Sequence, residues 1–179
     1  MTAEDSTESL VHLVPWGPED LPLLEKLLGD PQMMVHLGGP ESLEKIRSRQ
    51  KRYEDSERLG DSSKDRTLKI EHTATGAGAG WVGYWESRWR NEQVYEIGWS
   101  VLPAFQGRGI ATAAAAQALH LLRSAARHRH VHAFPAVDNH GSNAVCRRLG
   151  FELVGECQVE YPPGQFIRGN DWRLELLGG

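Results

Sequence analysis

The stretch from Ala104 to Leu122 reads AFQGRGIATAAAAQALHLL and joins two contrasting segments. Gln106–Gly109 (QGRG) is a loop with two glycines and one fixed positive charge, and the alanine-rich segment after it predicts a helix. The first turn of a helix leaves backbone N–H groups unpaired and carries partial positive charge. Glycines in the preceding turn can adopt positive φ and let an anion approach these N–H groups closely. The stretch therefore predicts an anion site, suited to a diphosphate, at a strand-to-helix turn.

Composition limits the classes of protein to which the chain can belong. Its 179 residues are about one domain's worth, and 40% hydrophobic residues are enough for one core. Lys and Arg number 20 against 24 Asp and Glu, and this net charge of −4 argues against nucleic-acid binding by bulk charge. Cys146 and Cys157 form no CxxC pair, so neither a disulfide framework nor a zinc site is indicated.

The chain also lacks the sequence features of membrane and secreted proteins. No apolar run approaches the roughly 18 residues needed to span a bilayer. The polar start, MTAEDSTES, is unlike a signal peptide. We therefore expect a cytoplasmic protein without nucleic-acid or membrane partners, a monomer or homodimer, with a disordered leader at 1–8 and a single domain at 9–179.

Hydrophobic periodicity predicts a mixed α/β fold with about seven strands and four helices. The expected strands are 9–14, 67–72, 81–89, 94–102, 131–134, 151–161 and 171–176. The expected helices are 18–28, 41–59, the alanine-rich segment to about 127, and 142–149. The charged side chains of the helix at 41–59 are expected to form a solvated face.

A second glycine cluster, Gly78–Gly83, matches the GxGxxG pattern of dinucleotide-binding proteins. That pattern binds a pyrophosphate only where it leads from a strand into a helix. The residues around it, WVGYWESRW, are aromatic and typical of a strand. We therefore interpret the cluster as a hairpin turn followed by a strand glycine.

Histidines and tryptophans provide weaker candidates for functional sites. His128, His130 and His132 alternate, but no acidic residue lies close in sequence to complete a metal site, so solvated histidines are expected. Most of the tryptophans are expected in the core or on a sheet face, and one or two of them could form a wall of a substrate groove.

Two motifs in order give the chain a family resemblance. Gln106–Ala111 (QGRGIA) resembles the (Q/R)xxGx(G/A) signature of the GNAT superfamily of acetyl-CoA-dependent N-acetyltransferases, and Glu96–Pro103 is similar to the strand that precedes it. Asn139–Phe151 is similar to the second hallmark of the family, NxxS before a short helix that ends in LGF. The segment Gly169–Trp172, which leads into the last expected strand, resembles the corresponding segment of the family branch that acetylates the N-termini of ribosomal proteins.

The resemblance implies a twisted mixed sheet that splays between its fourth and fifth strands, here 94–102 and 131–134. The pantetheine arm of acetyl-CoA would lie in this splay against main-chain groups of the fourth strand, and the diphosphate would lie at the helix start. The residues that the resemblance assigns to acetyl-CoA are Trp99, Ser100, Val101, Gln106, Gly107, Arg108, Gly109, Ile110, Ala111, Thr112, Asn139 and Asn143. No metal is implied.

The catalytic residues that the resemblance implies are Glu96, Ser142 and Cys146. Many members use a carboxylate on the fourth strand as general base, which corresponds to Glu96. Ser142 could donate a proton to the leaving thiolate. Cys146 occupies the position of the family's proton-donating tyrosine and is expected to be a packing residue, while Phe134 replaces a glutamate that some members carry.

We therefore expect an enzyme that transfers the acetyl group of acetyl-CoA to a primary amine by direct attack in a ternary complex. The acceptor would be a small molecule or a protein N-terminus. The alternatives are a non-catalytic acyl-CoA-binding sensor of the same fold, and a nucleotide-dependent oxidoreductase based on Gly78–Gly83.

Overall fold

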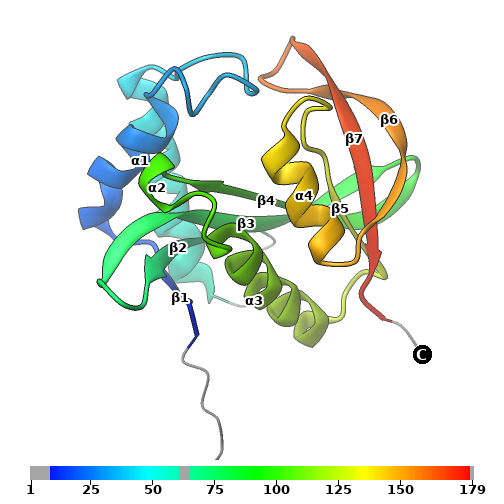
Figure 1. The fold of residues 1–179 in the computed structure, drawn as a ribbon, viewed down its shortest axis with the longest axis horizontal. Coiled ribbons are helices and arrows are strands. Elements are labelled where there is room, and N and C mark those ends of the chain that lie inside the picture. Colours follow the sequence, from blue (N-terminus) through cyan, green and yellow to red (C-terminus); the bar gives the residue numbers. More distant parts are fainter. Residues whose placement is uncertain (1–8, 61–64, 178–179) are drawn as a thin grey trace, which may run out of the picture.

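The computed structural model describes residues 9–60 and 65–177, so the leader predicted at 1–8 lies outside the described residues. They form one seven-stranded sheet in the order β1-β2-β3-β4-β5-β7-β6 (Figure 1). The strands are β1 Val11–Pro15, β2 Asp65–His72, β3 Ala77–Trp89, β4 Glu92–Val101, β5 His130–Ala133, β6 Glu152–Glu160 and β7 Phe166–Glu175. The helices are α1 Leu21–Leu28, α2 Leu43–Leu59, α3 Ile110–Ala125 and α4 His140–Arg148.

The mixed α/β fold predicted from the sequence is confirmed by this architecture. Strands β1 to β4 form an antiparallel meander, β4 and β5 are parallel, and β7 pairs antiparallel with both β5 and β6. A parallel pair needs a crossover connection. Here that connection is α3, the alanine-rich segment.

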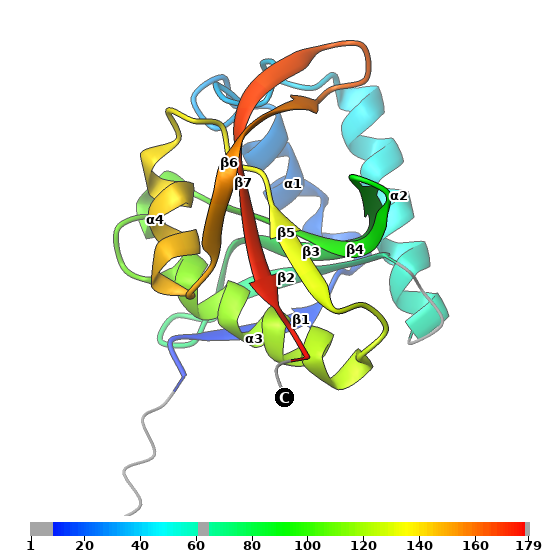
Figure 2. The same ribbon diagram turned by 90° about the vertical axis from the view of Figure 1, so that its right-hand side faces the viewer.

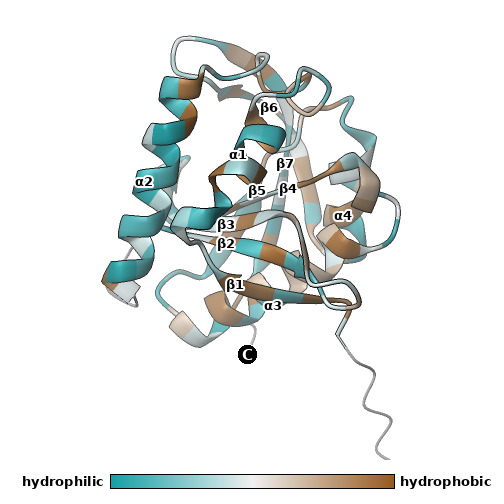
Figure 3. Cartoon of the chain, turned by 90° about the vertical axis from the view of Figure 1, so that its left-hand side faces the viewer, coloured by the Kyte–Doolittle hydropathy of each residue, from teal (hydrophilic) through white to brown (hydrophobic). Residues whose placement is uncertain are grey.

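Helices cover both faces of the sheet. Figure 2 shows α3 on one side of the strands and α1 with α2 on the other. The main core lies beneath α3, where its small residues Ala114, Ala115 and Ala118 allow close packing against Ile97 and Val101 of β4. A second cluster, which includes Trp16, Leu24 and Tyr53, packs α1 and α2 against the opposite face. Helix α2 is largely hydrophilic along its visible side (Figure 3). None of the helices in the described part of the chain is long and apolar enough to cross a bilayer.

The Gly78–Gly83 cluster lies within β3, which begins at Ala77 instead of Trp81. The expected hairpin turn is therefore wrong, while the expected strand glycine is confirmed at Gly83. The reason is packing between strands. A Cβ atom on Gly80 would lie 2.0 Å from the backbone oxygen of Ser100 on β4, and one on Gly83 would lie 3.1 Å from the backbone oxygen of Arg66 on β2. These glycines therefore allow the strands to approach closely, and no helix follows them to hold a pyrophosphate.

Candidate functional site

The splay between β4 and β5 begins halfway along β4. In the described residues the two strands pair at Tyr95 with Val131 and at Glu96 with His132, and no pairing continues beyond Glu96. Leu102 donates its backbone N–H to the carbonyl of Ala79 on β3. Because N–H and C=O groups alternate along a strand, those of Trp99 and Val101 point away from β3 into the gap.

One of these groups has an internal partner. The side-chain amide of Gln106 donates to the carbonyl of Val101 at 2.8 Å, which ties the glycine loop to the end of β4. Gly107 and Gly109 have φ values of 71° and 78°, which favour glycine. The loop is therefore held in a left-handed conformation directly before the first turn of α3.

The start of α3 has free donors that face the same gap. Gly109 is its N-cap, and no side chain among the described residues caps the helix there. The first turn contains no acidic residue, and the Thr112 hydroxyl is buried without a hydrogen-bond partner in the described part of the chain. Unpaired N–H groups and an orphaned hydroxyl at a helix start fit the phosphate oxygens of acetyl-CoA. Arg108 is exposed at the tip of this loop.

The start of α4 forms the opposite wall of the gap. The Asn139 side chain caps α4 by accepting the Ser142 backbone N–H at 3.1 Å, and both residues line the cavity described below. Asn143 lies one turn further on and is 2% exposed. Its amide donates to the carbonyls of Ala136 and Asn139, and its oxygen accepts from Asn170 and Trp172.

Through these four hydrogen bonds, the Asn143 side chain holds the loop before α4 against β7. Asn143 does not belong to the described lining of the cavity. The cofactor contact expected for Asn143 is therefore not available in this structure, because its donors and its acceptor are already occupied.

A single cavity of about 1060 Å³ passes through the splay. On the α3 side it is lined by Gln106, Gly107, Gly109, Ile110, Ala111 and Thr112, and on the α4 side by Asn139 and Ser142. Trp99, Ser100, Val101 and Glu96 of β4 line it as well. On the α2 side of the sheet it reaches Tyr53 and Trp85. The structure thus connects the uncapped helix start to a carboxylate on the other face of the sheet.

Glu96 faces the α2 side of the sheet. β4 pairs with β3 without a register shift from Glu92 to Val101, so Glu96 and Val101 point to opposite faces. The cavity passes through the sheet, and for this reason both residues line it. Burial raises the pKa of Glu96 above its ordinary value, while hydrogen bonds with Trp85 and Ser87 and the nearby His132 oppose that increase. A carboxyl with a raised pKa beside a cavity is suited to proton transfer near neutral pH.

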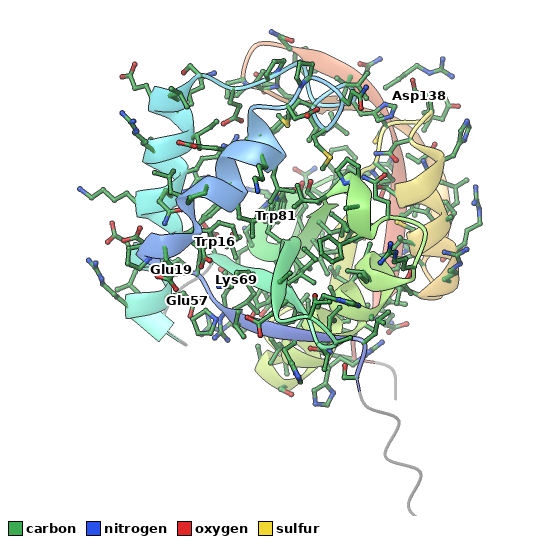
Figure 4. All side chains as sticks on the ribbon, turned by 60° about the vertical axis from the view of Figure 1, so that its left-hand side comes forward. Trp16, Glu19, Glu57, Lys69, Trp81 and Asp138 are labelled. Atoms are coloured by element: carbon green, nitrogen blue, oxygen red, sulfur yellow. The ribbon has the colours of Figure 1, made fainter. Side chains whose placement is uncertain are left out.

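Two tryptophans form walls beside Glu96. A Cβ on Gly98 would lie 3.3 Å from Cη2 of Trp85 and 3.5 Å from Cη2 of Trp81, so both rings lean over this glycine. Figure 4 shows Trp81 in the middle of the molecule, beside α1. Aromatic faces beside a carboxylate favour a cationic or alkyl-linked amine.

Helix α2 provides a wall of the cavity through Arg49 and Tyr53. Arg49 donates to both carboxylate oxygens of Glu41 and, at 2.8 Å, to the hydroxyl of Tyr161 before β7. The side chains of Arg49 and Glu41 are only 24% and 9% exposed. The solvated face expected for α2 is therefore wrong at Arg49, which joins α2 to the β6–β7 hairpin. The inward stripe of Ile46, Gln50 and Tyr53 was the available signal, because Arg49 lies beside it on the helix.

Cys146 lies in the main core, completely buried, and does not belong to the described lining of the cavity. Burial raises the pKa of its thiol to about 12. Such a thiol is a weak acid without access to the cavity, so proton donation by Cys146 has no support in the structure.

Replacing Cys146 by Ala is expected to leave most of the turnover intact, because only packing is lost. Steady-state kinetics of Cys146→Ala beside the parent test this prediction. A loss of kcat beyond about a hundredfold, the scale of a positioned general acid, would contradict it.

The histidines are not solvated as expected. His132 is 4% exposed, and its Nδ1 lies 2.6 Å from Asp171. The His130 Nδ1 lies 2.6 Å from Glu92, and His128, which precedes β5, packs its ring on Tyr95. Within residues 9–60 and 65–177 no group of three or more His, Cys, Asp or Glu side chains is arranged to hold a metal ion.

Comparisons with known proteins agree with this geometry. The family model described as an acetyltransferase (GNAT) domain matches residues 11–152. No curated protein matches the sequence. Among solved structures, the Salmonella typhimurium acetyltransferase that modifies the N-terminal serine of ribosomal protein L7/L12 has a TM-score of 0.73 at 22% identity, over 93% of this chain and 95% of that one.

Two further structures share the fold at similar distance. Spermidine N-acetyltransferase from Vibrio cholerae has a TM-score of 0.73 at 17% identity, over 94% of this chain and 96% of that one. A GNAT-family acetyltransferase from Bacillus anthracis has a TM-score of 0.73 at 16% identity, over 93% and 95% of the two chains. The family model matches most of the chain, and the splayed sheet and the glycine loop agree with it. The chain therefore belongs to the GNAT family of acetyl-CoA-dependent N-acetyltransferases.

Proposed function

We propose that the protein acetylates a primary amine held beside Glu96, with acetyl-CoA bound along the splay from the start of α3. The observation that carries the proposal is the continuous cavity from Thr112 to Glu96. It has room for a thioester on one side of the sheet and an amine on the other. The relatives from Salmonella and Vibrio act on an N-terminal serine and on spermidine, which are both primary amines.

Backbone groups would hold the cofactor. The N–H groups from Gly107 to Thr112 would bind the diphosphate, because they lie at an uncapped helix start. The exposed main-chain groups of Trp99 and Val101 would pair with the amides of the pantetheine arm in the manner of an extra strand. Asn139 lies across the gap from them and would contact the same arm.

Acetyl-CoA would supply an activated acyl group. Side chains around the cavity would accept protons from the amine and donate a proton to the leaving group. Most primary amines are cationic at neutral pH, so a carboxylate at Glu96 both attracts the ammonium and accepts its proton. The free amine then attacks the thioester carbon, a C–N bond forms, and the C–S bond breaks. The hydroxyl of Ser142, which lines the cavity at the first turn of α4, would donate a proton to the leaving thiolate and take the second proton of the attacking nitrogen, so that an amide, a free thiol and an unchanged serine result. Proximity supplies much of the rate, since both substrates occupy one cavity.

An acceptor screen tests this function. Acetyl-CoA is supplied with polyamines, aminoglycosides, amino acids and N-terminal peptides, and both the release of CoA thiol and the mass of the acetylated amine are measured. We expect amide formation with at least one class, with one thiol released for each amine acetylated. If acetyl-CoA binds but no amine in the panel is acetylated, the result favours the non-catalytic acyl-CoA sensor.

A further inference from the structure

A second carboxylate lines the cavity in the same row of the sheet as Glu96. Glu96 of β4 is paired with Trp85 of β3, and Trp85 is paired with Asp65 of β2. Residues directly opposite one another on antiparallel strands point to the same face of a sheet. The side chains of Glu96, Trp85 and Asp65 therefore all point to the α2 face, and all three residues line the cavity.

The row fixes the separation of the two carboxyl-bearing residues. Neighbouring strands lie about 4.8 Å apart, so the backbones at Glu96 and Asp65, with one strand between them, lie about 10 Å apart. The Trp85 ring leans from β3 towards β4, since a Cβ on Gly98 would lie 3.3 Å from its Cη2. Thr67, two residues from Asp65 on the same face of β2, lines the cavity too. The floor of this part of the cavity is therefore aromatic near Glu96 and polar near Asp65.

Helix α2 forms the wall above this row. The cavity is lined along one side of the helix by Arg49, Arg52, Tyr53 and Ser56. The Ser56 hydroxyl donates to the backbone carbonyl of Asp65, which holds the last turns of α2 at the start of β2. The acceptor part of the cavity thus extends beneath α2 as far as Asp65.

The arginines of this wall do not present two free positive charges to the cavity. Arg49 donates to both carboxylate oxygens of Glu41, so its charge is balanced within the protein. Arg52 is exposed, and its guanidinium carbon lies 5.7 Å from the centre of the Tyr53 ring. In the described lining of this face, two carboxylates therefore stand against one exposed guanidinium. That balance favours an acceptor with two positive charges over one with a negative tail.

We propose that the acceptor is an alkyl diamine, whose reacting amine lies at Glu96 and whose second ammonium group lies at Asp65. This assignment rests on the proposed function and names the class of amine that the site takes. The alkyl chain lies along the Trp85 ring, and about four to six methylene groups span carboxyl-bearing residues about 10 Å apart. The second ammonium keeps all its protons, so the reaction at the first nitrogen is unchanged. Asp65 is then a residue that determines specificity.

A matched set of acceptors tests this pairing in the parent enzyme. The set is 1,5-diaminopentane, pentylamine and 5-aminopentanoate, which share a five-carbon chain and end in an ammonium, a methyl group or a carboxylate. We expect kcat/KM to be about fivefold higher for the diamine than for pentylamine, the scale of one ion pair that remains in contact with water. 5-Aminopentanoate should be the poorest acceptor, because its carboxylate would face Asp65.

A pair of variants locates the effect at Asp65. In Asp65→Asn the ratio of kcat/KM for the diamine to that for pentylamine should fall to about one, through a higher KM for the diamine. The matched control is Asp55→Asn. Asp55 lies on α2, accepts a hydrogen bond from Arg58 at 3.2 Å and does not belong to the described lining of the cavity. Asp55→Asn should keep the parental ratio.

The comparison of acceptors uses the parent alone, so it stands even if Asp65→Asn does not fold. Equal kcat/KM values for the diamine and pentylamine would overturn the diamine assignment. A parental ratio retained in Asp65→Asn would overturn it as well, and so would a preference for 5-aminopentanoate, which would place the second group at Arg52. A parent that acetylates no amine would instead contradict the proposed function.

Discussion

Replacing Glu96 by Gln is expected to lower kcat by about 10²–10⁴-fold, the range for a positioned acid–base group. The Gln side chain preserves the shape of the site and cannot accept the amine proton. Acetyl-CoA affinity should be nearly unchanged, because Glu96 lies on the face of the sheet opposite to Val101 and the α3 core. Raising the pH should partly restore the rate, since more of the amine then arrives without its proton.

The parent enzyme should show the matching pH dependence. Catalysis needs Glu96 ionised, and burial raises its pKa, so activity is lost as the pH falls through a value above that of an ordinary glutamate. Glu92→Gln is the control, because Glu92 shares the strand and the face with Glu96 but lies outside the described lining of the cavity. If the Glu96→Gln enzyme turns over at the parental rate at neutral pH, Glu96 has a structural role only and is not the general base.

Replacing Gly109 by Val is expected to abolish acetyl-CoA binding. Gly109 has φ of 78°, a conformation that β-branched residues rarely adopt, and it is the N-cap of α3. The new side chain would turn the loop amides away from the diphosphate. Thermal unfolding checks the prediction: acetyl-CoA at about a hundred times its Kd should stabilise the parent by about 2.7 kcal/mol and the variant not at all.

Gly76 provides the matched control for backbone strain. It also has positive φ, 65°, and lies in the β2–β3 turn away from the described lining of the cavity. Gly76→Val should therefore unfold at a lower temperature and still be stabilised by acetyl-CoA. If Gly109→Val keeps the parental response to acetyl-CoA, the assignment of the loop is wrong.

Local sequence patterns predicted the helices and strands well, because hydrophobic periodicity and glycine positions can be read from neighbouring residues. The QGRG loop before an alanine-rich helix predicted the start of α3, and the structure has its N-cap at Gly109. The position of β7 between β5 and β6 was not predictable in this way. Strand order depends on packing between segments that are distant in the sequence, and the hydrophobic periodicity of one segment does not indicate its partners.

The same limit applies to the site. Glu96 could be singled out by its strand, but its burial and its neighbour His132 depend on the register of β4 and β5. His132 was expected to be solvated because its partner, Asp171, lies 39 residues away in the sequence. Asn143 lies within a family motif, and its position there suggested a contact with the cofactor. Its hydrogen bonds with Asn170 and Trp172 of β7 show that it has a structural role instead.

The most direct measurement of the central claim is a crystal structure of the protein with acetyl-CoA. We expect the diphosphate oxygens to contact the N–H groups from Gly107 to Thr112 and the pantetheine arm to pair with Trp99 and Val101. The thioester should then lie where the cavity passes through the sheet, within reach of an amine held by Glu96. A diphosphate bound away from the start of α3, or a thioester on a path that does not approach Glu96, would contradict the account.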